Sequence, residues 1–139
     1  MNLNRFVEAQ SFVWERVAQE LINGKKVSHW MWFIFPQLQS LGTSKLSLFY
    51  GITNREEAFA YSTHEVLGSR LCYACYLLNW KSADVTAVQI FGEVDAAKLR
   101  ACLTLFSIAD PAQPVYGECL KKFFESPDVR TVELLDSRL

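Results

Sequence analysis

Apolar residues recur at intervals of three and four along much of the chain, and this spacing limits the fold more than any other feature. In residues 4–22 the apolar positions are Phe6, Ala9, Val13, Val17, Ala18, Leu21 and Ile22. A helix with about 3.6 residues per turn places them on one face, which can then be buried. Gly24 follows, where a left-handed residue commonly ends a helix. The pattern therefore predicts a helix over residues 4–22.

Similar stripes fill the second half of the chain. Helix starts are predicted from capping residues and prolines at Asn54, Thr63, Ser82, Asp95, Pro114 and Pro127. Gly92 is expected to end the helix that Ser82 opens. The chain has 139 residues, of which 50% are hydrophobic and 21% are charged, and this is enough apolar material for one core. We therefore expect an all-α (mainly α) protein, a single irregular helical domain of six to seven helices spanning residues 1–139.

The run SHWMWFIFPQ, at positions 28–37, interrupts these stripes with consecutive apolar residues. So short a run does not distinguish one helical turn from a short strand. Proline disfavours helix in the residue before it, so Phe35 is expected to be extended. Neighbouring side chains point in different directions and cannot all be buried. We therefore expect most of these rings in the core and one or two, from Trp30 or Trp32, at a cleft.

A cleft beside this run would suit a planar, negatively charged molecule. The predicted ligand-binding residues are Lys26, Trp30, Trp32, Gln37, Arg70 and Lys98. A tryptophan face would meet the planar group, Gln37 would supply polar contacts, and the basic side chains would meet the charge. Structural roles are the alternative for three of them. Trp30 can be a buried plug, Lys98 a solvated side chain, and Arg70 the partner of an acidic neighbour.

A hydrolytic reaction in such a cleft would need a general base, and the candidates are His29 and Glu57. The unperturbed pKa of histidine lies near neutrality, and the ring-rich stretch after His29 could shift it. Glu57 would qualify if it were buried near His29; alternatively, it stands three residues after Asn54 in the spacing of a capping box. His29 can instead be a structural histidine bonded to a backbone carbonyl. The other histidine, His64, lies at a predicted helix start, where it can simply cap the helix.

Composition argues against several classes of protein. The net charge is −1, the acidic and basic residues are interspersed, and no basic patch for nucleic acid is visible. No apolar run approaches the ~20 residues of a membrane span, and the N-terminus does not resemble a secretory signal, so a cytoplasmic protein is expected. Cys72 and Cys75 fall inside a predicted helix and are expected to be buried, reduced thiols. No glycine-rich phosphate loop or metal-spaced cluster occurs, so neither a cofactor nor a metal is expected.

Several segments together resemble a bacterial family of unknown function, domain-of-unknown-function family 1810. They are RFVEAQ at 5–10, SHWMWFIFPQ at 28–37, YGI at 50–52, HEVLGSRL at 64–71, IFG at 90–92 and LTLF at 103–106. The run at 28–37 is highly specific, and the resemblance extends from about residue 5 to residue 135. It implies a mainly helical single-domain fold and supplies no established activity. Members are sometimes labelled calpastatin, although nothing in this chain resembles a protease-inhibitor repeat.

The chain departs from the family pattern at two places. Glu65 follows the histidine of the fourth segment, where the family usually has proline, and Ala101 and Cys102 stand where a pair of serines is usual. If the pair of serines has a chemical role in the family, this chain has lost or altered that role.

Two functions are consistent with these observations. The first is a pocket-bearing protein or hydrolase that acts on a small anionic ligand, nucleotide-like or ADP-ribose-like. The alternative is a non-catalytic protein-interaction module, in which an aromatic-rich surface contacts a partner or forms a homodimer.

Overall fold

The computed structural model describes residues 1–136, which form nine α-helices and one short 3-10 helix, η1. The elements are α1 (Asn4–Ser11), α2 (Trp14–Asn23), α3 (Met31–Ile34), η1 (Gln39–Leu41), α4 (Lys45–Phe49), α5 (Arg55–Thr63), α6 (Glu65–Asn79), α7 (Ala87–Ala109), α8 (Val115–Phe123) and α9 (Val129–Asp136). Seven of these helices have eight residues or more. The prediction of a mainly α protein with six to seven helices is confirmed, with α3 and α4 as additional short turns.

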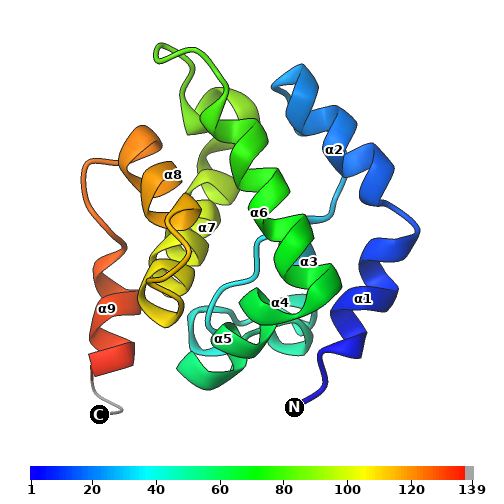
Figure 1. Ribbon diagram of the computed structural model, residues 1–139, viewed down its shortest axis with the longest axis vertical. Helices are drawn as coiled ribbons and strands as arrows, with labels where there is room; N and C mark the ends of the chain where they lie inside the picture. Colours follow the sequence, from blue (N-terminus) through cyan, green and yellow to red (C-terminus); the bar gives the residue numbers. More distant parts are fainter. Residues whose placement is uncertain (137–139) are drawn as a thin grey trace.

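Helix α6 runs through the middle of the molecule and contacts α2, α5 and α8, while α7 lies behind it (Figure 1). Its buried face carries Leu67, Leu71 and Leu78. Helix α7 contributes Leu99 and Phe106 to the same core. The buried side chains form one continuous cluster that extends from α1 to α9.

The predicted helix over residues 4–22 is wrong at one point, because the chain turns at Phe12 and forms two helices. Helix α1 buries Phe6 and packs against α3, whereas α2 buries Val17 and packs against α6. One straight helix could not direct its apolar face at both neighbours. The corner leaves the Phe12 side chain 92% exposed. The predicted end of α2 is confirmed, since Gly24 has φ +75° in the left-handed region.

Histidine, rather than the predicted Thr63, caps the N-terminus of α6. The Nδ1 atom of His64 accepts hydrogen bonds from the backbone N–H groups of Val66 (3.1 Å) and Leu67 (3.2 Å). His64 therefore has the capping role that the sequence left open. The predicted cap of α5 is confirmed, because Asn54 Oδ1 accepts from the backbone N–H of Glu57 at 2.9 Å.

Helix α7 begins later than predicted and changes direction at glycine. Thr86, not Ser82, forms its capping box, through bonds in both directions with Gln89. The predicted break at Gly92 is present, because this residue has φ +82° and helical geometry stops there. The backbone N–H of Lys26 donates to the Ile90 carbonyl at 2.8 Å, which ties the segment after α2 to the helix just before the break.

The aromatic run forms one helical turn, α3, and buries the rings of Trp30 and Phe35 in the core. Trp30, Met31, Ile34 and Phe35 are at most 2% exposed. The edge of the Phe91 ring packs against Trp30 and Phe35, with ring centroids 6.3 and 5.9 Å away. Phe33 is half-buried and packs against this core, whereas Trp32 is half-buried and is not part of it, so the run divides its rings between the core and the surface.

The carboxylate of Glu20, on α2, holds the start of this run in place. It accepts hydrogen bonds from the backbone N–H groups of Val27 (2.8 Å) and Ser28 (3.1 Å), from the Ser28 hydroxyl and from Trp30 Nε1 (2.9 Å). Burial by itself would raise the pKa of Glu20. The hydrogen bonds from Ser28, Val27 and Trp30 outweigh burial and lower the pKa to about 2.

Candidate ligand-binding site

A cleft opens between α3, α4 and α7, and we call it the Lys98 cleft. Its inner part is narrow, with room for about one water molecule, and is lined by Met31, Trp32, Phe35, Gln37, Ser47, Tyr50, Gly51 and Lys98. Its outer part, of about 210 Å3, is lined by Gln37, Leu41, Gly42, Thr43, Ser44, Ser47 and Lys98. The two parts share Gln37, Ser47 and Lys98, so the polar side chains lie where the narrow part widens.

Three predicted ligand-binding residues from two distant segments meet in this cleft. Trp32 and Gln37 come from the aromatic run, and Lys98 comes from α7. The Lys98 Nζ lies 5.4 Å from the centroid of the Trp32 ring, within the range of a cation–π contact. Within residues 1–136, no protein group hydrogen-bonds to the side-chain amide of Gln37. The cleft thus offers an amide, a cation and an indole to an incoming molecule.

Asp95 lies between two lysines on the α7 side of the cleft. Its Oδ2 is 2.9 Å from Lys26 Nζ, and its Oδ1 is 3.8 Å from Lys98 Nζ. The Lys26 side chain is 8% exposed, and its Nζ lies 5.0 Å from the centroid of the Trp30 ring. Lys26 is therefore closely paired, whereas Lys98 is 26% exposed and held more loosely.

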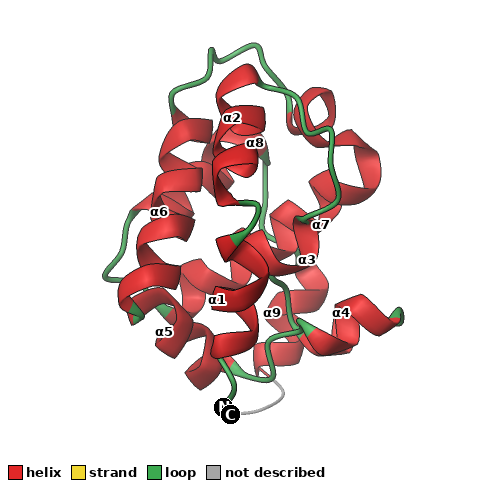
Figure 2. Cartoon of the chain, turned by 90° about the vertical axis from the view of Figure 1, so that its right-hand side faces the viewer, coloured by secondary structure: helices red, strands yellow, loops and turns green. Residues whose placement is uncertain are grey.

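The opposite wall of the cleft belongs to residues 39–51, which leave the body of the protein and return to the same place. Leu38 and Ile52 form a parallel bridge, in which Gln39 N–H donates to the Ile52 carbonyl and Ile52 N–H to the Gln37 carbonyl, both at 2.9 Å. Helix α4 lies between these ends and stands out from the other helices (Figure 2). It buries no residue, and Ser47 and the following Tyr50 face the cleft.

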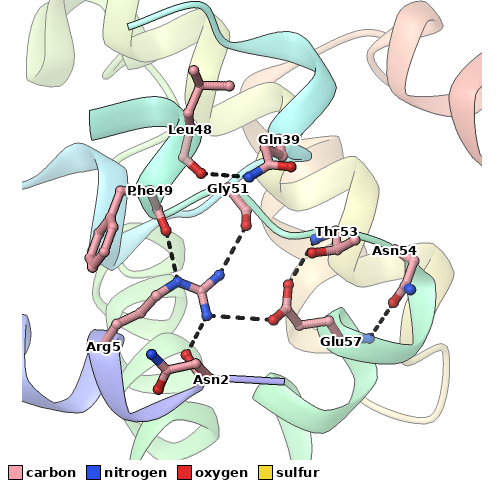
Figure 3. Close-up of polar contacts among 9 residues, drawn as sticks. All are labelled: Asn2, Arg5, Gln39, Leu48, Phe49, Gly51, Thr53, Asn54 and Glu57. Atoms are coloured by element: carbon pink, nitrogen blue, oxygen red, sulfur yellow. Dashed lines mark hydrogen bonds and ion pairs between the residues drawn. The ribbon is translucent and has the colours of Figure 1, made fainter. Parts of the chain in front are cut away.

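Arg5, on α1, fixes the C-terminal end of this segment. Its guanidinium donates to the carbonyl oxygens of Phe49 (2.8 Å), Gly51 (3.0 Å) and Asn2, and it contacts Glu57 Oε2 at 3.5 Å (Figure 3). The carbonyls of Phe49 and Gly51 belong to the residues on either side of Tyr50, and Tyr50 is part of the cleft wall. Arg5 therefore positions that wall without lining the cleft.

Glu57, predicted as a general base, is 4% exposed and lies in this Arg5 network. Its Oε1 accepts from the backbone N–H of Thr53 at 2.7 Å, and its Oε2 faces Arg5 (Figure 3). It borders a separate depression with Met1, Thr53 and Asn54. His29 is exposed and does not line the Lys98 cleft. The structure therefore places these two residues apart from Trp32, Gln37 and Lys98.

The other predicted ligand-binding residues have protein partners. Trp30 is 1% exposed and donates to Glu20, and Lys26 pairs with Asp95. Arg70 donates to Gln10 Oε1 at 3.2 Å and lies 5.6 Å from the centroid of the Trp14 ring. Among these three, none lines the Lys98 cleft.

Sequence reasoning missed the residues of the cleft that α4 and its flanks supply. Tyr50 and Gly51 belong to the YGI segment of the family resemblance, so a signal for them existed. Ser47 lies in a helix of five residues with no apolar stripe or motif. Its place in the cleft depends on the bridge between Leu38 and Ile52, which no local pattern indicates.

A second polar cluster joins α5, α6 and α8 at the end of α7. Ser62 Oγ donates to Asp110 Oδ2 at 2.6 Å and lies 2.7 Å from the Tyr116 hydroxyl, which in turn is 3.6 Å from Cys72 Sγ. The Ser62 hydroxyl has a single proton and donates it to Asp110, so Tyr116 must donate to Ser62. The Cys72 thiol is left to donate to Tyr116.

The four cysteines are free thiols, and Cys75, Cys102 and Cys119 are buried. A hydrogen bond with Cys119 and burial raise the pKa of Cys75, and burial raises the pKa of Cys102. The thiols of Cys75 and Cys102 therefore stay protonated at neutral pH. In the part of the chain that the structure describes, no three histidine, cysteine or acidic side chains are grouped to hold a metal. Nor is any helix of residues 1–136 both long and apolar enough to cross a bilayer.

These features define a mainly helical protein with one lysine-bearing cleft beside an aromatic run. The chain belongs to the family described as protein of unknown function (DUF1810), whose model matches residues 1–135. The resemblance predicted from the sequence is thereby confirmed. The chain is similar to a solved structure, the conserved hypothetical protein Rv1873 from Mycobacterium tuberculosis, with 44% identity over 96% of each chain and a TM-score of 0.94. A comparison with curated proteins finds no match.

Proposed function

We propose that the protein binds a small anionic molecule with a planar or apolar group, such as a nucleotide-like or ADP-ribose-like ligand, in the Lys98 cleft. One observation carries the proposal: Trp32, Gln37 and Lys98 line a single cleft in which the Gln37 amide has no hydrogen-bonding partner within residues 1–136. Concave sites with apolar walls and a few convergent polar groups are the usual form of small-molecule sites.

Each part of the cleft suits one part of such a ligand. Lys98 meets the negative charge, and the Gln37 amide can both donate and accept hydrogen bonds. Met31, Phe35 and Tyr50 give the narrow inner part an apolar wall. Since that part holds about one water molecule, only a small substituent enters it, and the body of the ligand lies in the outer part.

The geometry supports binding more strongly than hydrolysis. Neither His29 nor Glu57 is among the residues that line the cleft, and Glu57 already contacts Arg5 and the Thr53 N–H. A general base must come within hydrogen-bonding reach of the proton that it removes. The catalytic roles of these two residues therefore stay predictions.

A thermal-shift screen with nucleotides and ADP-ribose tests the proposal. A ligand at about one hundred times its Kd stabilises the folded state by about 2.7 kcal/mol, which raises Tm by several degrees in a chain of this size. Lys98→Gln should abolish the shift and Gln37→Ala should reduce it. Lys121→Gln, which removes the same charge from an exposed position on α8, should keep it. A shift that Lys98→Gln and Gln37→Ala leave unchanged would place the ligand elsewhere and contradict the proposal.

A second candidate function, a protein-interaction module, is favoured by an aromatic surface on α6 and its C-terminal cap residue, Trp80. Tyr73, Tyr76 and Trp80 are 45%, 49% and 74% exposed at a spacing that keeps them on one side of the helix. Tyr76 contacts Trp80, and Tyr73 contacts Trp14 of α2, with ring centroids 5.7 and 6.3 Å apart. Exposed tyrosine and tryptophan are enriched at protein interfaces.

Sedimentation velocity over a range of protein concentrations tests this candidate. A homodimer through this surface should dissociate when Tyr76 and Trp80 are both replaced by serine. Val129→Ser, at a position 64% exposed on α9, is the matched control and should leave the dimer intact. A protein that stays monomeric at every concentration tested would exclude the homodimer.

A further inference from the structure

We infer that the Lys98 cleft selects singly charged oxyanions, carboxylates or phosphodiesters, over doubly charged phosphates, and that Asp95 sets this selectivity. The inference rests on the proposed function and narrows it, because within the anionic ligands proposed for the same cleft it favours a singly charged carboxylate or phosphodiester over ADP-ribose, which carries two charges. It assigns Asp95 a role in specificity although Asp95 does not line the cleft.

The charge balance behind the cleft is the first observation. Among the residues that line the cleft within residues 1–136, Lys98 alone carries a full charge. Asp95 lies 3.8 Å from Lys98 and 2.9 Å from Lys26, so the three side chains together carry a net charge of +1. An anion that pairs with Lys98 also comes close to Asp95, and the partly buried carboxylate repels it.

The unequal pairing of the two lysines is the second observation. Lys26 is 8% exposed, is bonded closely to Asp95 and lies against Trp30, so it cannot swing toward a ligand without giving up its ion pair with the partly buried Asp95 carboxylate. Lys98 is 26% exposed and makes only a long contact with Asp95. One cation is therefore available to the ligand, and the second negative charge of a dianion would face Asp95.

The uncharged groups of the cleft favour the same class of ligand. Thr43, Ser44, Ser47 and Gln37 offer hydroxyl and amide groups, which hydrogen-bond to an oxyanion without neutralising it. A pyrophosphate site usually presents several cations or a glycine-rich series of backbone N–H groups. A singly charged oxyanion attached to a planar or polar body matches one lysine and several neutral donors.

The test measures binding by isothermal titration calorimetry at pH 8 and low salt, with four probes. Nicotinate and 3′,5′-cyclic AMP carry one negative charge as a carboxylate and a phosphodiester, respectively, whereas AMP and ADP-ribose carry two. Comparing nicotinate with cyclic AMP distinguishes the two sources of a single charge. We expect at least one singly charged probe to bind about threefold or more tighter than either doubly charged probe.

Three variants test the role of Asp95. Asp95→Asn raises the local charge to +2 and should tighten AMP or ADP-ribose by about five- to tenfold relative to the singly charged probe. Glu93→Gln removes the same charge from an exposed position on the same helix and should leave the preference within about twofold. The double variant Lys26→Met/Asp95→Asn removes the pair together, returns the local charge to +1, and should restore the original preference even if Asp95→Asn alone folds poorly.

The outcomes separate the two proposals. If doubly charged probes bind the unchanged protein as tightly as singly charged ones, or if Asp95→Asn changes the preference no more than Glu93→Gln, the selectivity inference is wrong and the proposed function stands. If none of the four probes binds, the proposed function fails for these ligand classes and the inference falls with it. If all probes bind but the double variant behaves like Asp95→Asn, net charge is not the determinant and the inference is overturned.

Discussion

Glu20 shows how one carboxylate positions the most characteristic segment of the family. Four donors from Val27, Ser28 and Trp30 converge on it, and no lysine or arginine takes part in these bonds. Hydrogen bonds to a charged acceptor are worth more than bonds between neutral groups. The segment that leads into α3 is thus fixed to α2 by an acid that must stay ionised.

We predict that Glu20→Gln lowers the free energy of unfolding by about 2 kcal/mol at pH 7, after allowance for screening near the surface. The pKa of Glu20 is about 2 in the folded state against an ordinary value of 4.5. A lowered pKa means that the stabilisation is complete above about pH 4.5 and is lost as the pH falls toward 2. Urea unfolding at several pH values should therefore show the difference between the two proteins shrinking over this window. Glu133→Gln, exposed on α9, is the control, and a difference that does not vary with pH would contradict the assignment.

At the scale of elements, close backbone approach between α5 and α6 depends on a single glycine. A Cβ atom added to Gly68 would lie 2.0 Å from the Ser62 carbonyl oxygen, and backbone cannot move aside as a side chain can. Gly117, inside α8, has nothing within 4 Å of the same position. The two glycines make a matched pair, since both lie in regular helices.

We predict that Gly68→Ala lowers the free energy of unfolding by about 2–3 kcal/mol, because α6 must move away from α5. Gly117→Ala should raise it by up to about 1 kcal/mol, since alanine restricts the unfolded chain and favours helix. Denaturant unfolding of both variants gives the comparison. Equal effects of the two substitutions would mean that helix propensity, and not contact with Ser62, decides the outcome at Gly68.

The contacts of Arg5 with backbone carbonyls lead to a second prediction at the scale of elements, for the substitution Arg5→Lys. Lysine keeps the charge of arginine but cannot donate to several carbonyls at fixed angles. Arg5→Lys should therefore lower stability by about 1–2 kcal/mol and speed hydrogen exchange at the amides of residues 49–53. It should also weaken ligand binding, because Tyr50 and Gly51 line the cleft. Arg130→Lys, exposed on α9, should change none of these, and unchanged exchange in Arg5→Lys would argue against its positioning role.

The helices were predictable where the signal is local, and the errors occur where distant contacts decide. The stripe of α6 and the breaks at Gly24 and Gly92 follow from spacing and from glycine geometry. The corner at Phe12 does not, because it depends on α1 packing mostly against α3 while α2 packs against α6. His64 replaces Thr63 as a cap because its imidazole Nδ1 reaches two N–H groups, an arrangement outside the usual capping preferences.

At the scale of the whole molecule, the cleft joins segments that the sequence keeps far apart. Residue chemistry was enough to single out Trp32, Gln37 and Lys98, but their meeting depends on the fold bringing α7 next to the aromatic run. The same chemistry also singled out Arg70 and Lys26, whose partners Gln10 and Asp95 become visible only in three dimensions. A sequence shows which residues are charged, but it does not show which of those charges are already paired within the protein and which can meet a ligand.

This arrangement predicts where a ligand protects the protein. A molecule in the Lys98 cleft touches α3, α7 and residues 39–51, so hydrogen exchange should slow in residues 31–51 more than in α8 or α9. The measurement compares the protein with and without whichever probe raises Tm. Equal slowing throughout the chain would indicate that the ligand acts only through global stability.

The contact between Lys98 and Trp32 also gives the protein an optical property. Of the four tryptophans, all within the described residues, Trp30 is buried, Trp14 is half-buried against Arg70, Trp80 is 74% exposed, and Trp32 alone lines the cleft. The emission of an indole depends on the charges near its ring, and the Lys98 ammonium lies 5.4 Å from the centre of this one. An anion that draws the ammonium away changes the light emitted by Trp32, so the intrinsic fluorescence of the chain reports on the cleft without an added label.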